Sequence, residues 1–237
     1  MKRILAVGCS HGNFADADAL SAVLRFKKQF KPHVTIHLGD ALDCEAFMGG
    51  KKGQECEPVS PDLESGVKFL TELRPDFYLF GNHEDRLERL RMSSNEIISF
   101  AANQILEHIR EWATRNKVKL LPYTANEQDL TIGNVRFMHG TVYNENAARD
   151  HAEAFAPWKG AVVFAHTHRT AQATGRRADH PTGFGVGTLT RRGAFDYAKA
   201  RRATLGWSQG FVWGYVTDTD SQLFLHEKQS QSWHLPG

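Results

Sequence analysis

Short clusters of polar residues follow apolar, strand-like runs at five points along this sequence. This arrangement constrains the possible folds more than any other feature of the chain. Each cluster offers imidazole, carboxylate, amide oxygen or thiol groups, from which protein metal sites are built. The clusters are residues 9–13, 39–43, 81–85, 139–140 and 166–168. Because open α/β sheets bind their ligands at the carboxyl ends of the strands, we expect all five clusters to meet there.

The apolar periodicity predicts the elements between these clusters. The predicted strands are residues 4–7, 34–38, 77–80, 118–121, 128–132, 134–138, 161–165, 211–216 and 222–226. The predicted helices are residues 15–30, 95–115 and 144–155. A polar stretch at about 49–65 predicts a surface loop, and the spaced glycines of 183–187 predict a turn-rich connection. Strands that alternate with helices, followed mostly by strands, indicate an α/β or mixed fold with one core.

Size and composition exclude several classes of protein. With 237 residues, 41% hydrophobic and 24% charged, the chain is typical of a globular protein, and we expect residues 1–237 to form a single domain. The net charge of +2 does not by itself indicate a nucleic-acid binder. Three cysteines fit free thiols in a reducing compartment. No targeting segment or run of about 18 apolar residues is recognised, so we expect a cytoplasmic protein that does not contact a membrane.

The order of the clusters resembles the calcineurin-like metallophosphoesterase family. The blocks of that family are Asp-x-His, Gly-Asp-x-x-Asp, Gly-Asn-His-Glu/Asp, a His often followed by Gly, and Gly-His-x-His. The matching segments here are Cys9-x-His11, Gly39-Asp40-x-x-Asp43, Gly81-Asn82-His83-Glu84, His139-Gly140 and Ala165-His166-x-His168. The resemblance spans about residues 4–170 and implies an α/β fold, a four-layer α-β-β-α sandwich of two mixed sheets. Residues of about 84–116 are then expected to form a helical insertion.

The resemblance also implies a centre with two divalent metal ions. One ion would be bound by Cys9, His11, Asp40 and His168, and the other by Asp40, Asn82, His139 and His166. Asp40 would bridge the two ions. His83 would be the catalytic residue rather than a ligand, acting as a general acid for the leaving oxygen or as a hydrogen-bond donor to phosphate.

Two positions depart from the family pattern. Cys9 stands where the family has Asp, and Ala165 stands where it has Gly. A thiolate is a softer ligand than a carboxylate, so Zn²⁺ or Fe²⁺ is favoured over Mg²⁺. The metals expected for the centre are therefore Mn²⁺, Fe²⁺ or Zn²⁺ rather than Mg²⁺. RNA lariat debranching enzymes, a branch of this family, also have Cys at that position, which points towards a nucleic-acid phosphodiester substrate.

The function implied by the resemblance is metal-dependent phosphoester hydrolysis by a hydroxide activated by two metal ions. A phosphodiesterase, either a nuclease or a nucleotide-directed enzyme, is favoured over a phosphomonoesterase. Cys44-Glu45 follows Asp43 where protein phosphatases of the family have Arg-Gly, which disfavours a phosphoprotein substrate. A family member that binds metal without catalysis is a further alternative. Residues 8–12 match the Gly-x-Ser-x-Gly motif of serine hydrolases, but only one strand precedes them, which disfavours that enzyme class.

Other candidate residues carry weaker signals. Asn13 and Arg169 are candidate substrate-binding residues, and Asp43 is either functional or an ordinary turn former. Residues 169–202 carry eight positive and two negative charges, which suits nucleotide or nucleic acid as a partner or is a solvated face. Trp207 and Phe211 either stack on bases or belong to the core. The sequence makes no prediction of the oligomeric state.

Overall fold

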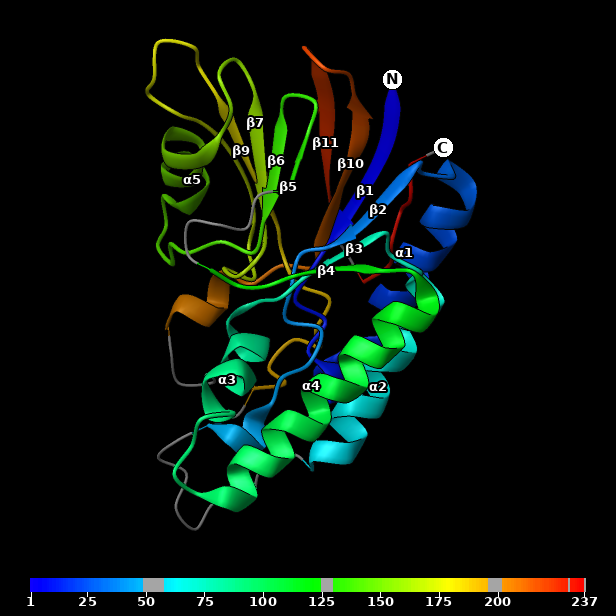
Figure 1. Ribbon diagram of the computed structural model, residues 1–237. Coiled ribbons are helices and arrows are strands. Elements are labelled where there is room, and N and C mark those ends of the chain that lie inside the picture. The colour runs from blue at the N-terminus through cyan, green and yellow to red at the C-terminus, as the bar shows by residue number, and fades with distance from the viewer. Residues whose placement is uncertain (49–57, 125–129, 196–201, 230, 237) are drawn as a thin grey trace.

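Two β-sheets pack face to face, with helices on both outer sides. The computed structural model describes residues 1–48, 58–124, 130–195, 202–229 and 231–236. Figure 1 shows the layers from left to right as α5, the sheet that contains β5–β7 and β9, the sheet that contains β1–β4, β10 and β11, and α1. The four-layer α-β-β-α sandwich of two mixed sheets is therefore confirmed.

The first sheet has six strands in the order β11-β10-β1-β2-β3-β4. Their bounds are β1 Lys2–Val7, β2 Val34–His37, β3 Phe77–Leu79, β4 Lys119–Leu121, β10 Gly210–Val216 and β11 Ser221–Glu227. Strands β1 to β4 run parallel, and β10 and β11 add antiparallel pairs at the other edge. The parallel strands end together, so the loops that follow β1, β2 and β3 lie side by side.

The second sheet has five strands in the order β5-β6-β7-β9-β8. Their bounds are β5 Leu130–Ile132, β6 Val135–Met138, β7 Ala161–Phe164, β8 Thr170–Thr174 and β9 Thr182–Val186. Strands β6, β7 and β9 are parallel, and the hairpins β5–β6 and β8–β9 are antiparallel. The loops after β6 and β7 therefore also lie at one end of the molecule.

The main core lies between the sheets and is made of side chains from their inner faces. Ile4, Ile36 and Leu79 of the first sheet pack against Phe137 and Val163 of the second. Alternate residues of β1, such as Leu5 and Val7, face the opposite side and pack under the helices. Because successive side chains of a strand point to opposite faces, the continuous apolar run of β1 serves both layers.

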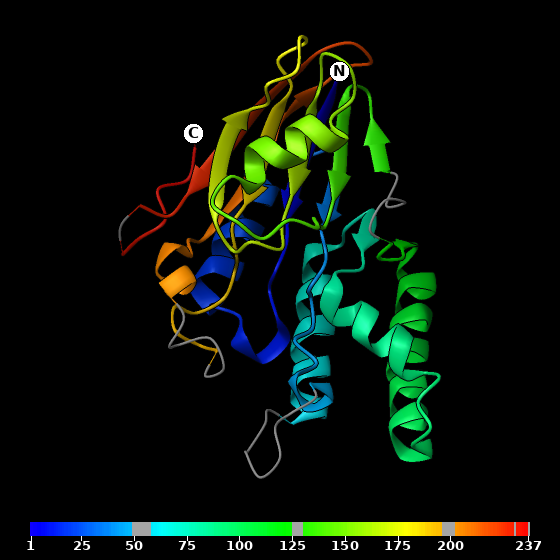
Figure 2. The same ribbon diagram turned by 90° about the vertical axis from the view of Figure 1, so that its left-hand side faces the viewer.

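Helices cover the outer faces of both sheets. Their bounds are α1 Ala17–Phe30, α2 Val59–Leu73, α3 Asn82–Leu90, α4 Glu96–Asn116 and α5 Ala147–Phe155. Helices α1 and α2 cover the first sheet, and α5 covers the second. Helix α4 packs against α2 and α3 through an apolar stripe that includes Ile105, Ile109 and Trp112. Figure 2 shows α2, α3 and α4 extending beyond the strands at the end of the molecule away from both termini.

Some sequence expectations were wrong. The surface loop expected at about 49–65 is helical from Val59 onward, because Leu63, Phe69 and Leu70 of α2 pack on the core, and residues 49–57 lie outside the described part of the chain. Gly183 and Gly185 belong to strand β9 rather than to a turn, because the segment pairs with β7 and β8. They are glycines because the backbone of α5 and of Arg169 approaches them too closely for a Cβ.

Candidate metal centre

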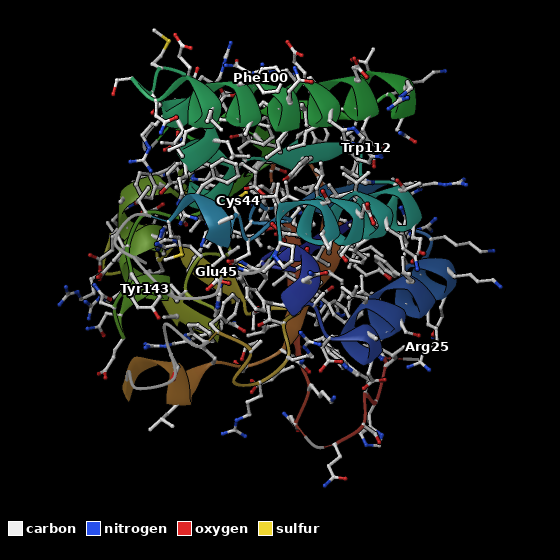
Figure 3. All side chains as sticks on the ribbon, turned by 90° about the horizontal axis from the view of Figure 1, so that it is seen from below. Arg25, Cys44, Glu45, Phe100, Trp112 and Tyr143 are labelled. Carbon is white, nitrogen blue, oxygen red and sulfur yellow. The ribbon has the colours of Figure 1, made fainter. Side chains whose placement is uncertain are left out.

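The five polar clusters meet at the carboxyl ends of the parallel strands, as expected. Cys9 and His11 follow β1, Asp40 follows β2, and Asn82 and His83 begin the helix after β3. His139 follows β6 of the second sheet, and His166 and His168 follow β7. The candidate centre therefore joins both sheets, and Figure 3 views the molecule from this end.

The backbone at this centre adopts a conformation that side-chain-bearing residues rarely adopt. Five of the seven expected metal ligands have a φ between 50° and 65°. They are Cys9, His11, Asp40, His166 and His168. Each such residue costs roughly 1–3 kcal/mol, and residues of this kind cluster at functional sites. The surrounding contacts hold these residues in place and thereby direct their side chains to one point.

Two glycines allow the strand ends to approach closely. A Cβ on Gly81 would overlap the Asp40 carboxylate, and a Cβ on Gly39 would lie 2.6 Å from His139 Nδ1. Gly39 also has a φ of 104°. The glycines that precede Asp40 and Asn82 are thus required for packing around the centre.

The first group of potential ligands is Cys9, His11, Asp40 and His168, all of them buried. One possible ligand atom from each residue lies within 4.8 Å of all the others. The Nε2 atoms of His11 and His168 are 2.9 Å apart, and His11 Nε2 is 3.8 Å from Asp40 Oδ2. Thiolate, imidazole and carboxylate form a donor set that suits Zn²⁺ or Fe²⁺.

The second group shares Asp40 with the first and adds His139 and His166. Asn82 Oδ1 lies 3.1 Å from His139 Nε2 and 2.8 Å from His166 Nδ1. His139 Nε2 also lies 3.2 Å from Asp40 Oδ2. Asp40 therefore lies between the two groups, where a bridging carboxylate is expected.

The hydrogen bonds around these histidines leave acceptor atoms facing one another. His139 Nδ1 donates to the Leu38 carbonyl at 2.7 Å, which turns the lone pair of a neutral His139 Nε2 towards Asn82 Oδ1 and Asp40 Oδ2. His11 Nδ1 likewise lies 2.9 Å from Asp43 Oδ1, so its Nε2 faces His168 Nε2. Such clusters of acceptors need a positive charge between them. A proton on the His139 or His11 ring supplies it in the absence of metal, since burial opposes the charge of both rings but Asp40 and Asp43 outweigh it and raise their pKa values. A divalent cation would take the place of that proton, so the residues present fit divalent cations.

The electrostatics of the histidines agree with ligand chemistry. Burial and the nearby charge of His139 lower the pKa of His166 to about 3, and burial with the charge of His11 lowers that of His168 well below its usual value. Both rings are therefore neutral at pH 7 and keep a lone pair for a cation. Burial opposes the charge of Asp40, but the charges of His139 and His83 outweigh it and hold its pKa well below the usual range.

Cys9 is a neutral thiol in the absence of a cation. Burial and the charge of Asp40 raise its pKa well above the usual value. The backbone N–H of His166 is hydrogen-bonded to the thiol, which partly opposes the rise. A bound divalent cation would reverse this balance, because a metal-coordinated thiol is deprotonated.

Asp43 connects the candidate ligands to the expected catalytic residue. Its Oδ1 lies 2.9 Å from His11 Nδ1 and 3.4 Å from His83 Nδ1, and His83 Nδ1 is also close to the Asp43 carbonyl oxygen. The rings of His11 and His83 are 4.7 Å apart. Asp43 is thus part of the site rather than only a turn former.

Two further buried carboxylates support the site and were not singled out from the sequence. Glu84 accepts hydrogen bonds from the backbone N–H groups of Asp40, Ala41, Leu42 and Gly81 and from the Tyr78 hydroxyl. Asp62 of α2 accepts from the N–H groups of Asp43 and Cys44. The sequence gives no signal that Glu84 contacts Asp40, Ala41 and Leu42, which lie more than 40 residues away along the chain.

The weaker candidates lie beside the centre but do not join the ligand groups. Asn13 Oδ1 accepts a hydrogen bond from Ser65 Oγ, and its carbonyl accepts one from Arg191. Arg169 lies directly after His168, with its guanidinium 5.8 Å from the ring centroid of Tyr143. Ser10 is buried and lies 3.2 Å from the buried His37 Nε2, so it is not presented to a substrate as a serine nucleophile would be.

The described part of the basic segment of 169–202 divides between the two ends of the molecule. Arg176 and Arg177 pair with Glu153 and Asp179 at the end of β8 and β9 away from the centre. Arg169 and the exposed Arg191 lie at the end that carries the centre. Lys199 and Arg201 lie outside the described residues, and only part of the described positive charge is near the candidate ligands. Phe211 is fully buried in the core.

Comparison with known proteins identifies the class to which this fold and site belong. Residues 2–185 match the family of calcineurin-like phosphoesterases. The chain belongs to this family, which comprises metal-dependent phosphoesterases. In the described part of the chain, no helix is long and apolar enough to cross a membrane.

Individual relatives are distant. The chain is 24% identical over 230 residues to the gene 54 protein of Mycobacterium phage D29, covering 89% of this chain and 87% of that protein. It is 23% identical to the gene 54 protein of phage L5, with coverage of 89% and 88%. Among solved structures, a D62A mutant of Vps29 from Entamoeba histolytica aligns with a TM-score of 0.50 at 13% identity, over 97% of this chain and 94% of that chain. Yfce, a phosphoesterase from E. coli, aligns with a TM-score of 0.43 at 16% identity, over 93% and 96%. These structural likenesses concern the fold alone.

Proposed function

We propose that this protein is a phosphodiesterase that uses two divalent metal ions and acts on a nucleotide or nucleic-acid phosphodiester. The observation that carries the proposal is the convergence of two ligand groups on Asp40, with His83 beside them. Cys9, His11, Asp40 and His168 would hold one ion, and Asp40, Asn82, His139 and His166 the other. Ions bound there would lower the pKa of a water molecule and neutralise charge on the phosphoryl oxygens.

His83 is suited to donate a proton to the leaving oxygen. Its Nδ1 is directed at the Asp43 carbonyl and carboxylate, which leaves Nε2 on the opposite side of the ring. Its backbone N–H donates to Asp40 Oδ1 at 3.0 Å, so the residue is held relative to the proposed ligands. A proton at Nε2 would pass to the leaving oxygen as the phosphorus–oxygen bond breaks.

Cys9 favours a diester over a monoester, because RNA lariat debranching enzymes, which act on a phosphodiester, also have Cys at this position. Asp40 and Asp43 are buried carboxylates with lowered pKa values, and Cys9 adds a third anionic group when it binds a cation. Two divalent cations would more than balance these three charges, so the site would accept an anionic phosphoester. Asn82 adds only a neutral oxygen. Cys9 also favours Zn²⁺ or Fe²⁺ over Mg²⁺.

The test is hydrolysis by metal-depleted protein reconstituted with Mn²⁺, Fe²⁺, Zn²⁺ or Mg²⁺. We expect bis-p-nitrophenyl phosphate to be hydrolysed faster than p-nitrophenyl phosphate, and His83→Ala to lose about 10²–10⁴-fold in kcat. His108→Ala, which removes an exposed histidine from α4, is the matched control and retains full activity. The reverse ranking of the two esters would favour a phosphomonoesterase. Equal inactivity of wild type and His83→Ala with every metal would favour a non-catalytic metal-binding protein.

A further inference from the structure

An exposed aromatic side chain lies at the rim of the candidate metal centre. Tyr143 is 47% exposed, yet its ring centroid is 5.8 Å from that of His166. Figure 3 shows Tyr143 at the edge of the end that carries the centre, on the side away from Arg25 of α1. Aromatic rings bury a large apolar surface when they are covered, so a half-exposed ring beside a catalytic centre offers a stacking surface to a substrate.

Two neighbouring side chains hold the Tyr143 ring in position. Trp207 Nε1 donates a hydrogen bond to Tyr143 Oη at 3.2 Å, and the Arg169 guanidinium lies 5.8 Å from the Tyr143 ring centroid. Trp207 itself packs edge-to-face on His168, with 4.4 Å between the ring centroids. The aromatic surface is thus in contact with one candidate ligand of each ion. Because the ring is already ordered, stacking on it costs less entropy than ordering a free side chain would.

Trp207 also lines a cavity of about 530 Å³, which is large enough for a nucleotide. The charged residues that line this cavity are Asp16, Arg191, Arg192, Glu227 and Lys228. Asp16 caps α1 and accepts a hydrogen bond from Gln209, so its charge is already compensated by protein donors. Lys228 pairs with Asp18 at 3.1 Å, and Glu227 lies next to it in the chain. Arg191 and Arg192 therefore form the basic wall of the cavity, which suits the phosphates of a strand that continues beyond Trp207.

We propose that Tyr143, Trp207 and Arg169 form a nucleobase-binding subsite and that the substrate is a single-stranded nucleic acid. The inference rests on the phosphodiesterase activity proposed above and names its substrate class. The base next to the scissile phosphate stacks on Tyr143, while the following phosphates lie along the basic wall of the cavity. A base within a duplex already stacks on its neighbours, so an exposed protein ring of this kind selects an unpaired base.

Binding tests the subsite without any need for catalysis. Fluorescence anisotropy would measure the affinity of the Zn²⁺-loaded protein for a labelled oligothymidylate of ten nucleotides and for an abasic strand of the same length and charge. Both strands would have phosphorothioate linkages, which resist cleavage. We expect the base-containing strand to bind at least fivefold tighter, since stacking contributes about 1–3 kcal/mol per base. Equal affinity for the two strands would overturn the proposal.

Variants test whether the preference for the base-containing strand depends on Tyr143. Tyr143→Ala is expected to bring the affinity ratio close to one, whereas Tyr143→Phe retains the ring and most of the ratio. Trp158→Ala is the matched control, because Trp158 is 67% exposed but lies before β7, at the other end of the sheet. If the affinity ratio of the two strands is unchanged in Tyr143→Ala, or falls equally in Trp158→Ala, Tyr143 does not bind the base. Circular dichroism would verify that each variant is folded.

A kinetic comparison separates this proposal from the phosphodiesterase proposal. p-Nitrophenyl thymidine 5′-phosphate and methyl p-nitrophenyl phosphate share the leaving group and the scissile bond and differ only in the nucleoside. Hydrolysis of both with equal kcat/KM overturns the subsite but leaves the phosphodiesterase. If neither is hydrolysed, the phosphodiesterase proposal fails, and the anisotropy ratio still decides the subsite. If thymidine 5′-monophosphate competes for binding as tightly as the decamer, the substrate is a free nucleotide and not a single-stranded nucleic acid.

Discussion

The Asp43 carboxylate lies 2.9 Å from Nδ1 of His11, and both side chains are fully buried. This contact directs the Nε2 of His11 towards Asp40 and His168. The charge of Asp43 also raises the pKa of His11 against the effect of burial. A carboxylate in this position makes the imidazole a stronger electron-pair donor, as carboxylates behind metal-binding histidines do.

Asp43→Asn is expected to weaken metal binding by about 10–100-fold, the usual effect of losing such a partner. The amide keeps the size of the side chain but removes its charge, so His11 loses both its orientation and its basicity. Competition with a fluorescent chelator would measure the affinity for Zn²⁺. Asp85→Asn is the control, because the Asp85 carboxylate pairs with Arg89 one turn along the same helix. Unchanged affinity in Asp43→Asn would show that His11 does not depend on this carboxylate.

Glu84→Gln is expected to destabilise the fold by roughly 3 kcal/mol or more. The Glu84 carboxylate accepts hydrogen bonds from four backbone N–H groups and a hydroxyl, and an amide would turn a donor towards donors. Urea unfolding would measure the loss. Glu88→Gln is the matched control on the same helix; its carboxylate pairs with Arg91 and Arg110 near the surface, where ion pairs contribute about 0–1 kcal/mol. Similar losses in the two variants would contradict the structural role of Glu84.

Cys9→Asp is expected to shift metal preference from Zn²⁺ towards Mn²⁺ and Mg²⁺ by at least about tenfold in the affinity ratio. The change replaces a soft sulfur donor with a hard oxygen donor. The backbone accepts it, since Asp is among the residues that tolerate the φ of 52° at this position. Metal competition measured by isothermal titration calorimetry would report the ratio. Cys44→Ser, a change at a second buried thiol, is the control, and an identical ratio in wild type and Cys9→Asp would exclude sulfur ligation.

Removal of metal is expected to lower thermal stability. Without a cation, a proton on His139 Nε2 is the positive charge that separates the oxygens of Asn82 and Asp40, which lie 3.1 and 3.2 Å from it. A cation at one hundred times its Kd would stabilise the fold by about 2.7 kcal/mol. Differential scanning fluorimetry with EDTA and then with added Zn²⁺ would follow the change in Tm. The Tm of Asp40→Asn is expected to change much less on addition of Zn²⁺. A wild-type Tm that does not change with Zn²⁺ would argue against metal binding.

Several elements were predictable because their residues carry a local signal. The predicted helix of 95–115 is α4, Glu96–Asn116, since its apolar side chains recur at helical spacing. Strand β1 was predictable from its apolar run, and the meeting of the clusters from their position after strands. Strand β8, Thr170–Thr174, was not predicted, because it is a polar edge strand that is stabilised by pairing with β9.

The candidate site, like the fold, was predictable from the sequence only in part. The residue types and their order along the chain determined by themselves that imidazole, thiol and carboxylate groups follow successive strands, because the donor chemistry belongs to the side chains. Only the tertiary structure decided that Glu84 joins the loops after β2 and β3, that Asp43 serves both His11 and His83, and that Tyr143 lies beside His166. These contacts join segments from distant parts of the chain, and they arise from sheet packing and positive-φ backbone, which no local pattern encodes.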